Sequence, residues 1–595
     1  PRVKVLASSR EALGLAGERI FHVPSLGLPE LKAALDLVSR SEAVQLFVER
    51  AMAAQPRFSL NEQNAGAVGE ICRRLDGIPL AIELAAARIR LFAPEQIASR
   101  LNDRFKLLTG GSRTALPRQQ TLRALIDWSY DLLPESEKAL LRRVSVFAGG
   151  WTFEAAEAVC DSDDLLDALG RLVDKSLVAV DDGASDTRYR LLETVRQYAR
   201  EKLFDAGETE DARARHLAYF ARLAGEVGPK LVTGEAVVRL DQLEAEQDNL
   251  RAALEWAVDR DPSAALSMVH PLQPFWMQRA STVEGLAWAD AALRAAEAAP
   301  APDGRASRER QAALARVLAA KSALMFSLGD NAGARDVAIA GADLARALGD
   351  TEALTLALCF GATAHGFLGD FATARAWIEE SLALSRQIGY KFGIGIGLAN
   401  LVFLVSIDSP EAALPLLDET IAFARTTGNP WVMGLALTNV ARVARYAGRG
   451  RDARAMLEEA ASIGRASRNR GLHTISRSEL GHILRQDDEL DEAETVYQET
   501  LPAWLDHGRR AAAAHEMECL GLIAALQGRV TRAARLLGAA EAQREALNAP
   551  MTFYERVEYD AVAGPLRAAP EAAAAWAEGR RMTMDEAVAL ATDDR

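Results

Sequence analysis

The chain has 595 residues, enough for about four domains at roughly 150 residues each. Its net charge is -14, from 69 basic and 83 acidic residues, and 49% of the residues are apolar. Residues 1–202 hold 28 basic and 28 acidic residues, so the acidic excess lies in the rest of the chain. This balance argues against broad nucleic-acid binding, which needs phosphate-neutralising cations. The longest apolar stretch, Leu398–Ile407, is half the length that a bilayer requires, which excludes a transmembrane protein.

Cysteine and histidine residues show no pattern of a catalytic or metal centre. The four cysteines are far apart in the sequence, with no CxxC pair, which fits a reduced, cytoplasmic compartment. The eight histidines are scattered, and the nearest pairs, His473/His482 and His507/His515, lack the i, i+4 ligand spacing. We therefore predict no metal ligands, no catalytic residues and no enzyme complete in this chain.

The first segment predicts a buried strand, Val3–Leu6, that ends at a loop containing Ser8-Ser9-Arg10. A single strand needs partners, and the chain begins with Pro, so we expect a fragment or processed chain whose sheet lies upstream. Helical periodicity follows. It predicts helices over Ser41–Ala54, with Ser41 as the N-cap, over Ala65–Leu75 and over Pro79–Leu91.

Residues 118–205 predict a winged helix. Four helical segments come first, at Leu122–Leu133, Glu135–Val146, Phe153–Cys160 and Asp164–Val173. Two short β runs follow at Ser176–Val180 and Thr187–Leu192, and a helix over Glu193–Phe204 closes the module. The candidate recognition helix Asp164–Val173 is acidic, and Arg171 alone does not offset that charge. We therefore interpret this module as a structural arm and not as a DNA reader.

An internal repeat dominates the second half of the chain. Small residues recur every 39 or 40 positions, at Ala334, Ala374, Ala413, Ala453, Ala493 and Ala533. Five residues before each alanine stands a turn residue, in order Gly329, Gly369, Asp408, Gly448, Asp488 and Gly528. Each unit thus predicts a helix, a tight turn and a second helix that approaches the first closely, and such units stack into a solenoid. The element Gly393-Ile394-Gly395-Ile396-Gly397 lies in a repeat helix and predicts close helix packing, not a nucleotide loop.

Several motifs together resemble a known family. Leu6-Ala7-Ser8-Ser9-Arg10-Glu11 resembles the strand-end motif of NB-ARC-type switches, which belong to the signal-transduction ATPases with numerous domains (STAND). Gly77-Ile78-Pro79-Leu80-Ala81 looks like their Gly-Leu-Pro-Leu-Ala motif, and the run from Arg188 to Arg196 is similar to one in bacterial predicted ATPases of this type. Those proteins often continue into tetratricopeptide-like (TPR-like) repeats. The order of the modules extends the resemblance over nearly the whole chain.

The resemblance implies roles for three residues. Arg10 would be the sensor that reaches the γ-phosphate of ATP, a task that suits a guanidinium fork. Pro79 and Leu80 would pack against the adenine ring; the alternative is a Pro in the first turn of a helix and a core Leu. The family's Met-His-Asp motif aligns with Leu191-Leu192-Glu193, so Leu192 replaces the phosphate-sensing His, and we interpret it as winged-helix core.

A second departure is the absence of a phosphate-binding loop. No Lys follows a Gly anywhere in the chain, so GxxxxGK[ST] is missing, as is the metal-binding acidic strand. The resemblance therefore implies ATP or ADP, with Mg, as the cofactor of the intact parent. We expect neither tight nucleotide binding nor catalysis from this chain alone, although the parent could be a slow ATPase.

The predicted fold class is mainly α. The predicted domains are a remnant of a nucleotide-binding α/β core (1–29), a helical NB-ARC subdomain (30–117) and a winged helix (118–205). A helical linker or degenerate repeats (206–300), a TPR-like α-solenoid (301–547) and a C-terminal helical cap (548–595) follow.

The predicted function is the regulatory and sensor part of a nucleotide-dependent switch, in a cytoplasmic bacterial transcriptional regulator. The solenoid would bind a protein or small-molecule signal, with faster association for basic partners. DNA would be contacted only through an effector domain outside this chain, and nucleotide could drive oligomerisation. Two alternatives stay open: a non-enzymatic TPR scaffold, and the regulatory half of a nucleotide cyclase.

Overall fold

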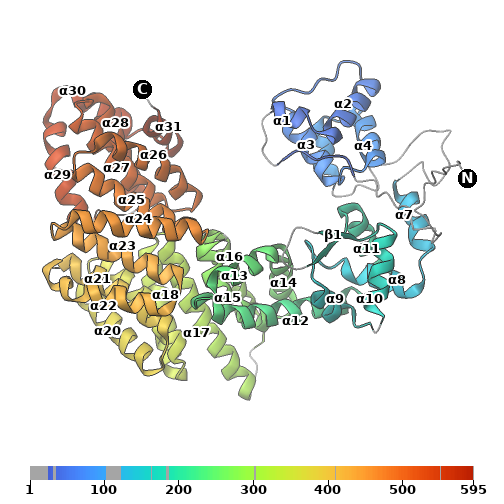
Figure 1. The fold of residues 1–595 in the computed structure, drawn as a ribbon, viewed down its shortest axis with the longest axis horizontal. Coiled ribbons are helices and arrows are strands. Elements are labelled where there is room, and N and C mark those ends of the chain that lie inside the picture. Colours follow the sequence, from blue (N-terminus) through green and yellow to red (C-terminus); the bar gives the residue numbers. More distant parts are fainter. Residues whose placement is uncertain are drawn as a thin grey trace, which may run out of the picture. The chain divides into compact units, whose positions relative to one another are not determined.

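The computed structural model describes residues 25–30, 35–101, 122–162, 164–181, 187–279, 281–300, 303–408, 410–547, 549, 551 and 553–593. The chain divides into two compact units, one of residues 1–220 with 248–253 and one of residues 221–247 with 254–595 (Figure 1). The expected strand Val3–Leu6 and the predicted sensor Arg10 lie outside the described residues. The mainly α fold class is confirmed.

The first unit begins with a block of short helices. They are α1 (Leu35–Ser39), α2 (Glu42–Ala54), α3 (Ala65–Arg74), α4 (Pro79–Ala86), the 3-10 turn η1 (Ala87–Arg90) and α5 (Pro94–Arg100). The three predicted helices are confirmed, although the last changes from α to 3-10 geometry after Ala86. Ser41 stands before α2 as predicted, but its hydroxyl donates to the carbonyl of Gly27 at 2.6 Å and does not cap the helix.

The winged helix follows, with bounds close to those predicted. Its elements are α7 (Leu122–Asp131), α8 (Glu135–Val144), α9 (Phe153–Cys160), α10 (Leu165–Asp174), β1 (Ala179–Asp181), β2 (Arg188–Arg190) and α11 (Glu193–Asp205). The two strands pair antiparallel, with Val180 opposite Tyr189. Tyr189 also exchanges both backbone hydrogen bonds with Trp151, at 2.8 and 2.9 Å. The buried Trp151 ring stacks on Phe147, which places the hairpin against the helical core.

Helices alone make up the rest of the described chain. First come α12 (Thr209–Val227), η4 (Gly228–Val232), α13 (Ala236–Ala245), α14 (Gln247–Arg260), α15 (Pro262–Gln278) and α16 (Thr282–Ala298). The repeats follow as α17 (Gly304–Ser327), α18 (Asn331–Leu348), α19 (Thr351–Phe367), α20 (Phe371–Gln387), α21 (Lys391–Asp408), α22 (Pro410–Thr427), α23 (Pro430–Tyr446), α24 (Gly450–Ala466), α25 (Arg470–Gln486), α26 (Leu490–Asp506), α27 (Arg510–Leu526) and α28 (Val530–Leu547). The end is formed by α29 (Phe553–Ala568), α30 (Pro570–Gly579) and α31 (Met584–Thr592).

The repeat register read from the sequence is confirmed. All six recurring alanines lie near the start of the second helix of a pair and are at most 1% exposed. Five of the six turn residues adopt a left-handed backbone just after the preceding helix. Their φ values are 66 to 87°, at Gly329, Gly369, Gly448, Asp488 and Gly528. Asp408 differs, because it is the last residue of α21.

The glycines of α21 show why small residues are needed between repeats. A Cβ on Gly395 would lie 2.5 Å from Val432 of the next repeat, and one on Gly397 would lie 2.7 Å from Leu382 of the preceding helix. Real side chains do not approach so closely, so the helices could not pack as they do. The predicted role of the glycine-rich element in helix packing is confirmed.

The helices that precede the repeats contact the middle of the array. Asn429, 1% exposed, donates from Nδ2 to the carbonyls of Leu231 and Thr233 at 3.2 and 3.1 Å. Farther along, the turn residue Arg468 reaches Asp241 and Glu244 on α13, at 3.2 and 2.8 Å. These contacts join segments about 200 residues apart, so residues 228–245 are part of the folded array.

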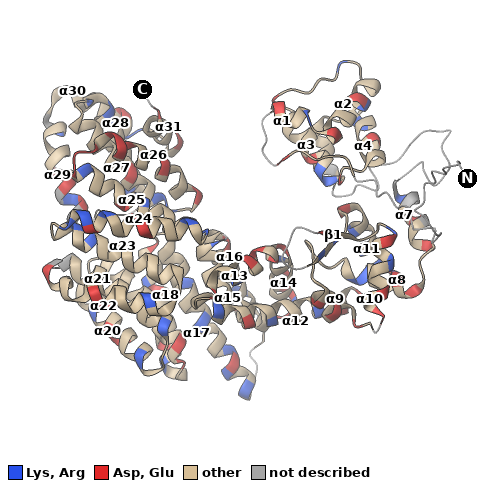
Figure 2. Cartoon of the chain, in the orientation of Figure 1, with Lys and Arg blue, Asp and Glu red and all other residues tan. Residues whose placement is uncertain are grey.

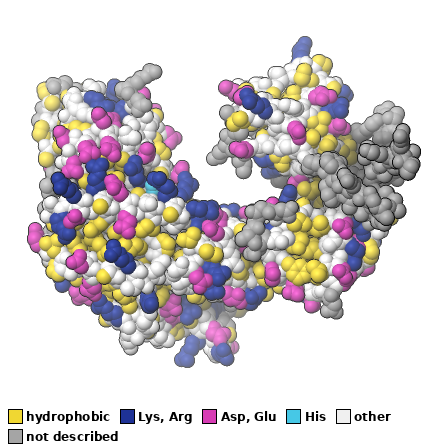
Figure 3. Space-filling model, in the orientation of Figure 1, with side chains coloured by type: hydrophobic (Ala, Val, Ile, Leu, Met, Phe, Trp, Pro, Cys, Tyr) yellow, Lys and Arg dark blue, Asp and Glu magenta, His cyan; other side chains and the backbone are white. Residues whose placement is uncertain are grey.

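The surface of the described chain mixes both signs of charge. Figure 2 shows basic and acidic residues interspersed along the helices, and the face drawn in Figure 3 carries both, among apolar side chains. None of the described helices combines the length and the apolar character needed to cross a bilayer.

Candidate functional site

The turn between α3 and α4 leads directly into two of the predicted nucleotide-contacting residues, Pro79 and Leu80. Asp76 and Gly77 both have left-handed backbones, with φ of 54° and 66°. A Cβ on Gly77 would lie 2.4 Å from the carbonyl oxygen of Leu26, so only glycine fits there. Pro79 then starts α4 at its first position and is exposed, while Leu80 is half-buried. An exposed Pro beside a half-buried Leu leaves an apolar edge that a flat ring could contact.

A side chain of this turn also reaches the winged helix. The carboxylate of Asp76 accepts a hydrogen bond from the backbone N–H of Thr194, in the first turn of α11, at 3.3 Å. An acceptor at this position suits the unpaired N–H groups and the positive end of a helix. Leu192 stands at the N-cap of α11 and is half-buried, next to the buried Leu191. The structure therefore brings Asp76, three residues before Pro79, to the start of α11, while Arg10 lies outside the described residues.

The candidate recognition helix of the winged module uses its arginine internally. Arg171 forms ion pairs with Glu137 and Asp164, each at 2.8 Å. The Glu137 side chain is fully buried and also pairs with Lys175 at 2.7 Å. These pairs use Arg171, on α10, and Lys175, directly after α10, for contacts inside the module.

A network of charged side chains runs along the first helices of the last repeats, and we call it the charged ladder. Its members are Arg442, Arg445, Glu479, Arg485, Glu518, Arg544, Glu555 and Glu558, from α23, α25, α27, α28 and α29. Arg442 pairs with Glu479 at 2.7 Å, and although burial opposes ionisation, Arg442 holds the pKa of Glu479 below its ordinary value. Glu558 joins Arg445 and Arg485.

Two donors of the ladder have no hydrogen-bond acceptor among the described residues. The Nε atoms of Arg445 and Arg485 are buried, and among the described residues neither has a hydrogen-bond acceptor. An orphaned buried donor is costly and commonly marks a site for water or a ligand. The ladder is thus a candidate site for a polar ligand in the described repeat region.

Part of the ladder follows the 40-residue period, which the sequence analysis applied to small residues and turns but not to charged residues. Arg445 and Arg485 occupy equivalent positions of successive repeats, 40 residues apart. A search for polar residues at this spacing would have indicated the face. Its pairing could not be predicted, because Glu558 and Glu555 come from the tail and not from a repeat.

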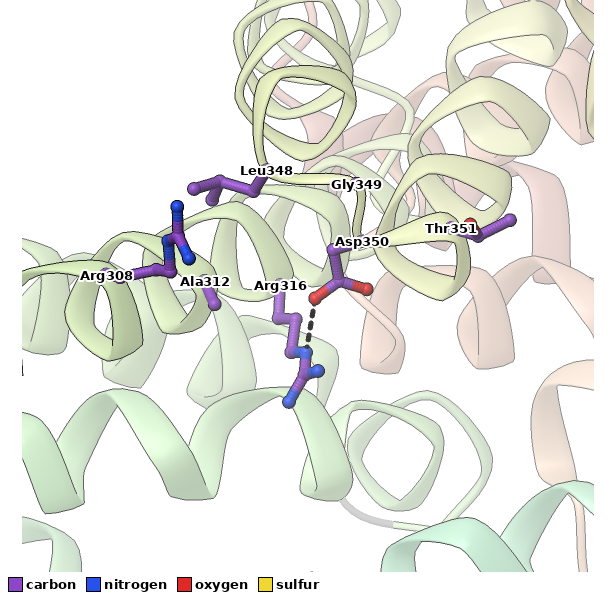
Figure 4. Close-up of a pocket in the computed structure, with 7 residues that line it drawn as sticks. All are labelled: Arg308, Ala312, Arg316, Leu348, Gly349, Asp350 and Thr351. Atoms are coloured by element: carbon purple, nitrogen blue, oxygen red, sulfur yellow. Dashed lines mark hydrogen bonds and ion pairs between the residues drawn. The ribbon is translucent and has the colours of Figure 1, made fainter. Parts of the chain in front are cut away.

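A pocket of about 350 Å³ lies between α17 and the turn from α18 to α19 (Figure 4). Its lining residues are Arg308, Ala312, Arg316, Leu348, Gly349, Asp350 and Thr351. Asp350 accepts from Arg316 at 2.8 Å and also caps α19 through the N–H of Ala353. Because its carboxylate serves the fold in both ways, we assign no ligand to this pocket.

Comparison with known proteins supports the recognition made from the motifs. Residues 133–204 match the winged helix-turn-helix domain family. The chain is 44% identical over 405 residues to a Mycobacterium tuberculosis protein named "Putative HTH-type transcriptional regulator", a match that covers 66% of this chain and 43% of the relative. A second Mycobacterium tuberculosis protein, of no stated function, is 46% identical over 222 residues, covering 36% of this chain and 54% of the relative. The chain therefore spans about half the length of the curated relatives it matches.

Two solved structures are similar to the chain at low identity. One is a STAND protein with a tetratricopeptide repeat sensor from Pyrococcus horikoshii, with a TM-score of 0.43 and 14% identity, covering 90% of this chain and 71% of that one. The other is a Rap protein complexed with a competence and sporulation factor, with a TM-score of 0.40 and 13% identity, covering 61% of this chain and all of that one. By its own sequence and structure, the chain combines a winged helix-turn-helix domain with paired helices that repeat about every 40 residues.

Proposed function

We propose that this chain is the regulatory and sensor part of a nucleotide-dependent signal-transduction switch, in a cytoplasmic bacterial transcriptional regulator. The observation that carries the proposal is the hydrogen bond from the N–H of Thr194 to Asp76. It links the turn that resembles the family's nucleotide motif to the winged helix. The regulator named among the relatives supports the same role.

The switch would work through this turn. ATP or ADP, with Mg, is held mainly by a phosphate-binding loop upstream, and Pro79 and Leu80 contact the adenine ring. Arg10 reaches the γ-phosphate and so distinguishes ATP from ADP. A change at the turn is passed through Asp76 to α11 and alters the angle of the winged helix. Such a mechanism needs different contacts to the two nucleotides in two states.

The repeats would supply the signal. A protein or small-molecule ligand binds the repeat region and biases the nucleotide equilibrium, and the charged ladder, with its orphaned N–H donors, supports a polar ligand there. DNA is contacted through an effector domain outside this chain, and nucleotide drives oligomerisation. The chain by itself is not an enzyme.

Nucleotide binding by two versions of the protein tests the proposal. A version extended upstream to include a GxxxxGK[ST] loop should bind ATP and ADP, and residues 1–595 alone should neither bind them tightly nor hydrolyse ATP. In the extended protein, Arg10→Ala should weaken ATP more than ADP by about 1.5–3 kcal/mol, because one charge-assisted contact is lost. Calorimetry measures both affinities.

Three outcomes would count against the switch. Equal weakening of both nucleotides by Arg10→Ala removes this residue from the sensor role. ATP turnover by residues 1–595 shows that the chain is itself an enzyme. An upstream sequence without a phosphate-binding loop favours a scaffold, and one that encodes a cyclase domain favours the regulatory half of a nucleotide cyclase.

A further inference from the structure

Two histidines and a cysteine converge beside the charged ladder. His482 comes from α25, while His515 and Cys519 come from α27, one turn apart. The Nε2 atoms of the two rings are 3.3 Å apart, and Sγ of Cys519 lies 3.7 Å from Nε2 of His515. The three potential ligand atoms all lie within 4.8 Å of one another.

The nitrogen–nitrogen distance and the sulfur–nitrogen distance at His515 match those that a tetrahedral zinc ion imposes. Nitrogen ligands at about 2.0–2.1 Å from zinc lie roughly 3.3 Å apart, and a sulfur at about 2.3 Å lies roughly 3.6 Å from each nitrogen. As a direct hydrogen bond, by contrast, the contact between the two nitrogens is long. The arrangement of ligand atoms thus fits a shared ion better than direct pairing.

Neighbouring groups orient both rings for coordination. Nδ1 of His515 lies 3.2 Å from the carboxylate of Glu518, which Arg544 holds at 2.6 Å. Nδ1 of His482 lies 3.0 Å from the hydroxyl of Tyr497. A proton on each Nδ1, donated to its neighbour, leaves both Nε2 atoms free to bind an ion, and Arg544 also lies 3.3 Å from Nδ1 of His515. Partners of this kind on the second nitrogen are typical of metal-binding histidines.

We propose that His482, His515 and Cys519 form a zinc site that ties α25 to α27. On binding, the Cys519 thiol releases its proton, and any proton shared by the two rings is released as well. Zn²⁺ is then bound by two neutral nitrogens and a thiolate. The three ligands leave a fourth position open for water or a side chain of a bound partner, as in zinc sites that exchange a ligand. The His515 side chain is 20% exposed, which gives the ion an entry path.

Cobalt titration of the untagged chain 1–595, stripped of metal, tests the site. The chain should take up about one equivalent of Co²⁺ with a thiolate-to-cobalt charge-transfer band, and Zn²⁺ should displace it. Cys519→Ser should abolish the band and weaken uptake at least tenfold, roughly the least expected for a lost ligand. Cys359→Ser is the matched control, because Cys359 is equally buried but contacts Asn400, and it should keep the band.

A conservative change beside the site separates coordination from simple packing. Tyr497→Phe keeps the ring but removes the partner of His482, and it should weaken Co²⁺ roughly tenfold while the band remains. If Cys519→Ser does not fold by circular dichroism, His515→Gln replaces it, because that side chain is the most exposed of the three. No uptake of Co²⁺ or Zn²⁺ at micromolar concentration, or a band that survives in Cys519→Ser, would leave a hydrogen-bonded cluster only and overturn the zinc site.

Discussion

Single buried polar side chains determine how distant parts of the repeat region meet. Asn429 is the clearest case, because its two ends serve different segments. Its Oδ1 accepts from the N–H groups of Trp431 and Val432 and so caps α23. Its Nδ2 donates to the carbonyls of Leu231, in η4, and Thr233, which follows η4. One amide thus links a local cap to a long-range contact.

Replacing the Asn429 amide should lower the free energy of unfolding by more than the loss of a helix cap alone. We expect Asn429→Ala to lower the free energy of unfolding by about 2–4 kcal/mol, since a cap and two buried hydrogen bonds disappear. Asn469→Ala is the control, because Asn469 is as buried and caps α25 through Leu472. Its cost should be about 0.5–2 kcal/mol. Urea denaturation compares the two, and equal costs would show that the long-range contact contributes nothing.

Glu516 is a second buried polar residue, on α27. It is fully buried and accepts hydrogen bonds from Ser478, Thr500 and Trp504 at 2.5 to 2.9 Å. Burial raises the pKa of Glu516 above its ordinary value, although these three donors oppose the shift. The folded state therefore holds the proton more tightly than the unfolded state does.

Stability should depend on pH through this carboxyl. Between the ordinary pKa of a carboxyl and the raised folded pKa, the folded chain should lose stability as pH rises, because the unfolded chain releases the proton first. Glu516→Gln keeps the shape and removes the titration. We expect the variant to gain stability relative to the wild type as pH rises through this window, in urea melts at several pH values. A difference that does not change with pH would contradict the raised pKa.

At the scale of elements, small residues set the distance between paired helices. The recurring alanines pack against the opposite helix, and Ala413 of α22 belongs to a buried cluster with Val402, Leu417, Val440 and Val443. Side chains there fill the space between three consecutive helices. A larger residue would have to displace all of them.

Ala413→Trp should therefore overpack this crossing and cost about 1–3 kcal/mol of stability. Ala412→Trp, at the exposed neighbouring position of the same helix, should change stability by less than about 0.5 kcal/mol. Thermal melting compares the two variants. An unchanged melting temperature for Ala413→Trp would show that the repeat register does not place this alanine at a contact.

At the scale of the whole molecule, the proposed switch depends on one link inside the first unit. The hydrogen bond between Asp76 and the N–H of Thr194 joins the helical block to the winged helix. Asp76 also has a left-handed backbone, which limits the substitutions that leave the turn intact. Asp76→Gly keeps this conformation and removes the acceptor, whereas Asp76→Asn keeps both.

Hydrogen exchange at the start of α11 should distinguish these variants. We expect faster exchange of the Thr194 amide in Asp76→Gly, by roughly tenfold if about 1.4 kcal/mol of protection is lost. Asp76→Asn should exchange close to the wild-type rate. Equal exchange in all three proteins would mean that Asp76 does not couple the turn to the winged helix.

Much of this architecture could be predicted from local patterns. Phe153–Cys160 was predicted with the bounds observed for α9, and the recurring alanines gave the register of the repeats. Such features depend on contacts between residues close in sequence or one repeat apart, so their signal is periodic. Of the predicted site residues, Pro79 and Leu80 lie at the turn where the motif placed them, and their nucleotide contacts stay predictions.

What the sequence by itself determined is therefore the order of modules: a helical block, a winged helix with its hairpin, and repeats of about 40 residues. Only the tertiary structure brought Asp76 to Thr194, Asn429 to Leu231, and His482 to His515 and Cys519. The physical reason is the same in each case. These partners lie 118, 198 and 33 to 37 positions apart, on elements whose meeting depends on how whole helices stack, and no local pattern encodes that geometry.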